Sequence, residues 1–230
     1  MTGVGSDGVG GMIDFSLARQ AMVNGQLRTN DVTDSNLLDA FALLQRELFV
    51  DPAEISISYA DRMVTAAGNT NRMMLSPMVL GRMIQAVMIQ PGDAVLDIAG
   101  GAGYSAAIMS YLGGSVTLLE DQERQGDAAR KILQKIGVEN VHVGIGPLSE
   151  GGKTGVRYDA ILINGRCEIL PESLFHQLSD GGRLVAIMGF ALSSVVRVYT
   201  ASEGVMGEKR LMSAAGPALS SFSRRFEFVF

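Results

Sequence analysis

The chain has 230 residues, of which 47% are hydrophobic and 19% are charged, and this composition excludes a chain disordered throughout. The net charge of -5 at pH 7 gives no electrostatic reason to expect nucleic acid or an anionic membrane as a partner. Two histidines and a single cysteine, Cys167, make a clustered metal site of the usual His/Cys kind improbable, and we expect no metal.

The first 90 residues predict a helical lead-in. Residues 1–11 are rich in glycine, and we expect a flexible tail there, followed by a single domain over 12–230. Apolar residues recur at helical spacing in two runs, formed by Phe15, Ala18, Met22 and Leu27 and then by Leu37, Leu38, Phe41, Leu44 and Leu48. Thr33 or Asp34 is the expected cap of the second helix, and the mixed polarity of 51–72 predicts a connecting loop. Ser76 and Pro77 suit the start of a third helix, which should run to about Met88 and complete the lead-in.

From 91 to 230, short apolar runs alternate with longer amphipathic ones, the pattern of a parallel sheet built from strand–helix–strand units. We expect strands at 94–98, 115–120, 141–145, 158–164 and 183–189. Helices should cover 104–112, 122–136 and 171–178. Two alternating runs, 194–202 and 222–230, predict an antiparallel pair that closes the sheet. The prediction is an α/β fold, a Rossmann-like seven-stranded sheet with helices on both faces.

A glycine-rich segment follows the first of these strands. It places Asp97 at the strand end and glycines at 100, 101 and 103 before a helix, where doubly wound sheets bind ligands. The spacing does not fit the dinucleotide fingerprint GxGxxG. A methyl-donor site fits better, because Asp97 can accept from the ammonium of S-adenosylmethionine and an uncharged loop tolerates its sulfonium. The alternative is that the glycines serve only a tight strand-to-helix turn.

A second acid, Glu120, ends the next strand, 23 positions after Asp97. An acid at that place can accept hydrogen bonds from both ribose hydroxyls of a nucleoside. The alternative is an exposed carboxylate at a strand end. Taken together, the two acids favour a cofactor that contains a nucleoside.

Four segments, at 46–51, 97–104, 158–163 and 178–185, resemble in order the motifs of the protein-L-isoaspartate O-methyltransferase family. Residues 46–51 resemble its "pRe-FV" segment, and 97–104 its EIGTGSGY loop. Residues 158–163 resemble its "FDAIIV" strand, and 178–185 its "L-GG-LV" turn and strand. The resemblance implies transfer of a methyl group from S-adenosylmethionine to the carboxylate of L-isoaspartyl residues in damaged proteins or peptides, a protein-repair reaction. The cofactor-binding residues it implies are Asp97, Ala99, Gly100, Gly101, Gly103, Tyr104, Glu120, Ile145 and Gly146.

The chain departs from the family at positions near the expected site. Leu75 stands where the family has the serine thought to handle the substrate carboxylate, so Ser76, one place displaced, is the catalytic candidate, with helix capping as its alternative role. Ala99 replaces the first glycine of the cofactor loop, and Ile145 replaces an aspartate that contacts the adenine amino group. Asn164, with Gly165 and Arg166 after it, replaces a Thr-Ala-Ala stretch, and Arg166 is either a substrate partner or an exposed arginine.

Three functions remain open after this comparison. The first is a cytoplasmic, S-adenosylmethionine-dependent carboxyl methyltransferase whose partners are isoaspartyl proteins or peptides, with no nucleic acid and no membrane. The second is a methyltransferase with a different acceptor, and the third is a non-catalytic binding or scaffold protein that retains the fold.

Overall fold

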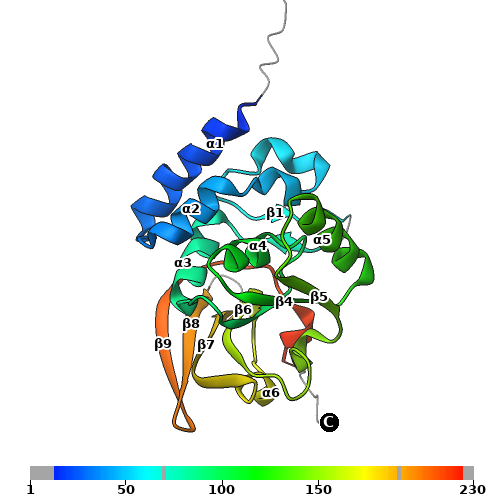
Figure 1. Cartoon of the computed structure of the whole chain (residues 1–230). Helices are drawn as coiled ribbons and strands as arrows, with labels where there is room; N and C mark the ends of the chain where they lie inside the picture. The colour runs from blue at the N-terminus through cyan, green and yellow to red at the C-terminus, as the bar shows by residue number, and fades with distance from the viewer. Residues whose placement is uncertain (1–12, 69–70, 191–192, 225–230) are drawn as a thin grey trace, which may run out of the picture.

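Seven strands form one mixed sheet at the centre of the molecule (Figure 1). The structure is a computed structural model that describes residues 13–68, 71–190 and 193–224. The strands are β3 (Ala94–Ile98), β4 (Ser115–Glu120), β5 (Val141–Ile145), β6 (Tyr158–Cys167), β7 (Leu178–Met188), β8 (Val195–Ser202) and β9 (Val205–Ser213). Their order is β5-β4-β3-β6-β7-β8-β9, in which the first five run parallel and β8 and β9 are antiparallel to their neighbours. The predicted α/β class and seven-stranded sheet are confirmed.

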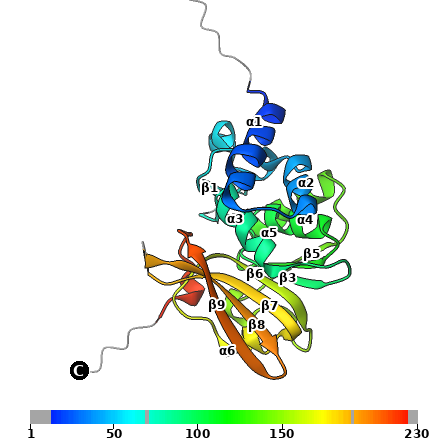
Figure 2. The same cartoon turned by 90° about the vertical axis from the view of Figure 1, so that its left-hand side faces the viewer.

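Helices cover both faces of the sheet, because successive residues of its inner strands alternate between two apolar layers. In β3, for example, Val95 faces the layer under α3 (Pro77–Val87), α4 (Tyr104–Tyr111) and α5 (Glu123–Lys135), whereas Leu96 faces the opposite layer. That second layer lies under α6 (Glu172–Phe175) and two single-turn helices, Leu148–Glu150 and Ser220–Phe222 (Figures 1 and 2). Among the described residues, no helix is both long enough and apolar enough to span a bilayer.

The first part of the helical lead-in, residues 13–43, packs on α3 and α4, away from the sheet (Figure 2). Helix α1 (Phe15–Met22) continues into a π-helical turn, Val23–Leu27, and α2 (Ser35–Leu43) follows. Asp34 caps α2 as predicted, with Oδ1 accepting from Leu37 N at 3.1 Å. The lead-in and the sheet share one apolar cluster, so the two parts of the chain are joined by a common core.

The lead-in differs from the prediction in its short elements. The second predicted helix ends at Leu43, and Arg46–Phe49 forms a separate 3-10 turn. The predicted loop at 51–72 contains a 3-10 helix, Pro52–Ile57, and strand β1 (Val64–Thr65), which pairs with β2 (Met73–Met74). Elements this short carry too few residues to show a hydrophobic period.

The C-terminal prediction needs a larger correction. The partner of β8 is β9 at 205–213, not the run at 222–230. A two-residue turn at Glu203 and Gly204, both with positive φ, joins the two strands as a hairpin. Most of β9 is exposed on both faces, so it lacks the alternation that marks a half-buried strand. Phe222 lies instead in a 3-10 turn, and 225–230 lie outside the described residues, as does the predicted tail at 1–11.

Three further boundaries differ. Strand β6 runs on to Cys167, β7 begins already at Leu178, and the helix predicted at 171–178 is only the four residues of α6.

Candidate functional site

The candidate site lies where the strand order reverses. The chain passes from β3 outward through β4 and β5, then returns to place β6 on the other side of β3. Ligands of open α/β sheets bind at the carboxyl ends of the strands beside such a reversal. Asp97 lies near the end of β3 and Glu120 ends β4, while Asn164 of β6 follows Ile163, which pairs with Ile98 at the end of β3.

Asp97 is fully buried and has two side-chain donors. Ser105 Oγ donates to Oδ2 at 2.6 Å, and Asn164 Nδ2 donates to Oδ1 at 2.6 Å and to the Ile98 carbonyl at 3.2 Å. Burial raises the pKa of Asp97 to about 7, although both hydrogen bonds act in the opposite direction. Ser105 was missed by the sequence analysis, which noted Asn164 only as a departure from the family. The single sequence signal for Ser105 is a hydroxyl in the first turn of the helix after the glycine loop.

The glycine loop is shaped first by Asp97 itself. A Cβ on Gly100 would lie 2.3 Å from Asp97 Oδ2 and 2.7 Å from Leu118 Cδ1. Gly101 and Gly103 have positive φ, and so does Ala99, at 59°. The glycine at 100 is therefore required by a carboxylate of the same chain, whatever ligand the loop holds.

Gly100→Ala is expected to lower the free energy of unfolding by about 1 to 3 kcal/mol, because the added methyl group overpacks the Asp97 site. Gly25→Ala is the matched control, since a Cβ at Gly25 meets nothing within 4 Å. Urea unfolding of both variants checks the prediction. Equal stabilities of the two variants would contradict it.

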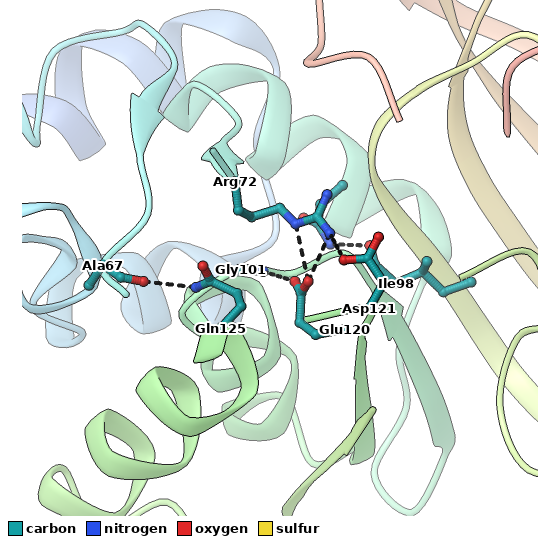
Figure 3. A network of polar contacts seen from close by, with 8 residues as sticks. Ala67, Arg72, Ile98, Gly101, Glu120, Asp121 and Gln125 are labelled. Carbon is teal, nitrogen blue, oxygen red and sulfur yellow. Dashed lines mark hydrogen bonds and ion pairs between the residues drawn. The ribbon is translucent and has the colours of Figure 1, made fainter. Parts of the chain in front are cut away.

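Glu120 is also fully buried, which contradicts the alternative that it is an exposed strand-end carboxylate. Its Oε1 accepts from Gly101 N at 2.6 Å, and its Oε2 accepts from Arg72 Nε at 3.1 Å and Nη2 at 2.9 Å (Figure 3). Arg72 Nη2 also donates to Asp121 Oδ1 at 2.7 Å. Burial raises the pKa of Glu120, while the charge of Arg72 acts against that rise. Arg72 was not predicted as a site residue.

The remaining predicted cofactor residues surround these two acids. Ile145 ends β5 and is 37% exposed, and Gly146 N donates to the Glu120 carbonyl at 2.9 Å. Tyr104 begins α4, and its ring lies 5.2 Å from that of Phe49 in the lead-in. Burial raises the pKa of Tyr104 to about 12, so its hydroxyl stays protonated at neutral pH.

Ser76 occupies the N-cap position of α3, but its hydroxyl makes no capping hydrogen bond. Asp61 Oδ1 accepts from Met78 N at 3.1 Å in its place. The Ser76 side chain therefore does not have the alternative role of capping the helix. Leu75, next to it, is buried, and Arg166 is half-buried, with Nη1 donating to the Gly189 carbonyl at 3.3 Å.

The hydrogen-bonding groups at this edge of the sheet are of the types that a nucleoside-bearing cofactor needs, since two buried carboxylates lie on either side of a main-chain loop. The space between the loop and the opposite wall is small, about 10 Å³. Its lining is Met73, Met74, Leu75, Leu80, Ala99, Gly100, Tyr104, Ser105 and Asn164. A small-molecule site typically has about 300 Å³ or more, so this space by itself is too small for such a ligand, and its lining includes neither Glu120 nor Ile145.

Comparison with known proteins identifies the family. The family model described as protein-L-isoaspartate(D-aspartate) O-methyltransferase matches residues 18–215. A protein-L-isoaspartate O-methyltransferase of Koribacter versatilis is 35% identical over 176 residues, covering 76% of this chain and 78% of that protein. One from Methylorubrum populi is 35% identical over 174 residues, covering 75% and 80%.

Solved structures agree in fold. A protein-L-isoaspartate O-methyltransferase structure matches with a TM-score of 0.77 at 23% identity, covering 89% of this chain and 67% of that one. A Plasmodium falciparum protein described as a putative member, in complex with S-adenosyl-L-homocysteine, matches with a TM-score of 0.73 at 16% identity, covering 91% and 100%. The fold is thus that of the Rossmann-like, class I methyltransferases. On the extent of the sequence match, the chain belongs to the protein-L-isoaspartate(D-aspartate) O-methyltransferase family.

Proposed function

We propose that the protein is an S-adenosylmethionine-dependent carboxyl methyltransferase that acts on L-isoaspartyl residues of damaged proteins or peptides. The observation that carries the proposal is the pair of buried carboxylates, Asp97 and Glu120, on either side of the glycine loop at the strand reversal. Family membership supports the same reaction. As part of this proposal, residues 12–230 act as one domain in the reducing cytosol.

Each site residue has a role in the proposal. Bound S-adenosylmethionine supplies an electrophilic methyl group on its sulfonium. Asp97 accepts from the cofactor ammonium, and Glu120 accepts from the ribose hydroxyls. The main chain from Ala99 to Gly103, with Tyr104 at the start of α4, holds the rest of the amino acid moiety of the cofactor. Ile145 and Gly146 flank the base.

The acceptor side needs little chemistry from the protein. A carboxylate is already a competent nucleophile near neutral pH, so the site has to desolvate it and hold it in line with the methyl group. Met73, Met74 and Leu75 line the small space beside the loop and provide an apolar wall. Ser76, whose hydroxyl is not used for capping, is the group we assign to orient the substrate carboxylate.

The test is methyl transfer from labelled S-adenosylmethionine to an isoaspartyl peptide, with the same peptide containing normal aspartate as control. A base-labile methyl ester on the isoaspartyl peptide alone is the expected result. Absence of this ester at high enzyme concentration would show the proposal to be wrong.

Ser76→Ala is expected to lower kcat/KM for the isoaspartyl peptide by about tenfold, through loss of one hydrogen bond to the substrate carboxylate. Ser202→Ala, in an exposed position of β8, is the control and should leave kcat/KM unchanged. Steady-state kinetics on both variants measures the effect. If Ser76→Ala retains full kcat/KM, the serine has no part in handling the substrate.

One observation favours a second candidate, a methyltransferase with another acceptor. The position where the family carries its substrate serine holds Leu75, which is apolar and 1% exposed. Labelled methyl transfer into a cell lysate, with isoaspartyl peptides left unmodified, would identify this function in place of the first.

A further inference from the structure

The Arg72 guanidinium holds the carboxylate that the proposed function assigns to the ribose. Glu120 accepts two hydrogen bonds from Arg72 on Oε2 and one from Gly101 N on Oε1 (Figure 3). A carboxylate offers about four acceptor positions, so three of them are already in use. Two ribose hydroxyls therefore cannot both bind Glu120 while Arg72 stays in place.

A backbone hydrogen bond, as well as its ion pairs, holds Arg72 over the glycine loop. Its carbonyl accepts from Ala66 N at 2.9 Å, next to the pairing of β1 with β2. A Cβ on Gly101 would lie only 3.4 Å from Arg72 Cγ, so the stem of the arginine passes directly over the glycine loop. The following residues, Met73 to Leu75, form one wall of the space of about 10 Å³. Arg72 and the wall thus belong to one short segment.

The two carboxylates that share Arg72 differ in burial. The side chain of Glu120 is 0% exposed, whereas that of Asp121 is 32% exposed, and the Arg72 side chain is 10% exposed. A buried carboxylate needs a cation or good donors, and the paired guanidinium satisfies Glu120 in this arrangement. Hydroxyl groups of a ligand can replace the hydrogen bonds that Arg72 donates to Glu120, but they cannot replace the positive charge of Arg72. When the guanidinium leaves Glu120, Asp121 can retain it at the surface.

We infer that Arg72 is an internal competitor for the nucleoside site, so that a ligand binds only when the guanidinium leaves Glu120 and stays with Asp121. The inference rests on the proposed function, because it assumes that Glu120 is the ribose acceptor. It adds a residue that sets cofactor affinity and that the family resemblance did not supply. The ion pair lowers the apparent affinity by the free energy needed to open it.

The test is calorimetric titration of the full chain with S-adenosylhomocysteine. Arg72→Gln removes the charge and is expected to bind about ten- to a hundredfold more tightly than the wild type. Arg82→Gln is the matched control, because Arg82 also pairs with an aspartate, Asp31, but outside the site. Its affinity should equal that of the wild type. Unchanged, weaker or absent binding by Arg72→Gln would overturn the inference.

A double-mutant cycle with Asp121 gives a second and independent readout. Asp121→Asn removes the outer partner, so in the wild-type background it should weaken S-adenosylhomocysteine binding about two- to fivefold. In the Arg72→Gln background the same change should have no effect. Equal effects in both backgrounds would show that Asp121 does not act through Arg72, and the inference would be wrong.

Two further measurements separate the possible outcomes. If Arg72→Gln does not fold, Arg72→Lys keeps the charge without the two-pronged hydrogen bonding and should also bind more tightly than the wild type, by a smaller factor. Methyl transfer to the isoaspartyl peptide tests the proposed function by itself. Tighter binding by the variant with no methyl ester would support the competitor role of Arg72 and reject the reaction.

Discussion

Arg46→Ala is expected to lower the free energy of unfolding by about 3 to 5 kcal/mol, the largest stability effect we predict for a single side chain. Arg46 is entirely buried in the lead-in, beside Tyr104 at the start of α4. Its Nε donates to the Ser58 carbonyl at 2.8 Å, and its Nη2 donates to the Leu75 carbonyl at 2.8 Å. The guanidinium carbon lies 5.0 Å from the centre of the Tyr104 ring. Alanine would leave both carbonyls without this donor and a hole beside the ring.

Two opposing effects decide the size of this loss. Burial lowers the pKa of Arg46, which shows that the charged form has a cost in this place, and an uncharged replacement relieves that cost. Arg46→Met keeps most of the volume and loses only the hydrogen bonds and the charge. We therefore expect a smaller loss for methionine, about 1 to 2 kcal/mol.

Urea unfolding of the two variants, with exposed Arg28→Ala as control, measures the difference. The control should stay within about 0.5 kcal/mol of the wild type. If Arg46→Met proves as stable as the wild type, the hydrogen bonds of Arg46 contribute no more than its burial costs. The link to function is direct, because Leu75 belongs to the wall of the candidate site.

The sequence predicts the sheet well where burial imposes a period. Strands β3, β4 and β5 have the bounds predicted for them, because each is a short apolar run between turn residues. Strand β9 was missed because nearly all of its side chains are exposed, and the hairpin turn at Glu203 and Gly204 is its clearest local mark.

The sequence predicts the site residues that a local pattern marks, but not the partners that come from distant segments of the chain. Asp97 and Glu120 stand out because each ends a strand, and a strand end has a fixed place in a parallel sheet. Arg72 lies 48 positions from Glu120 in a segment without hydrophobic periodicity, so no local pattern connects the two. Asn164 is similar, since only the pairing of β3 with β6 brings it to Asp97. Partners that meet across strands need the fold before they can be recognised.

Asp97→Asn is expected to weaken S-adenosylmethionine binding about 100-fold near neutral pH and to remove its dependence on pH. Only the ionised carboxylate attracts the cofactor ammonium. Burial, the largest influence, raises the pKa of Asp97 to about 7, and the charge of Glu120 acts in the same direction. The affinity of the wild type should therefore rise as the pH increases toward 7, by up to about tenfold per pH unit.

The stability of the free protein should change in the opposite direction over the same range. The folded pKa of Asp97, about 7, lies above its ordinary value of 3.8, so the folded state binds this proton more tightly than the unfolded state. The resulting stabilisation is complete below 3.8 and is lost as the pH rises to about 7. Through this one carboxylate, rising pH thus increases the affinity for the cofactor and lowers the free energy of unfolding. Both trends should be absent in the asparagine variant.

Titration calorimetry and urea unfolding between about pH 5.5 and about pH 7 measure the two trends, in a range where most of the ligand ammonium keeps its proton. The difference between the wild type and Asp97→Asn isolates Asp97 from all other groups that titrate. Parallel pH profiles of affinity for the two proteins would show that Asp97 does not hold the ammonium. Parallel profiles of stability would show instead that its carboxyl keeps an ordinary pKa, so each half of the prediction fails separately.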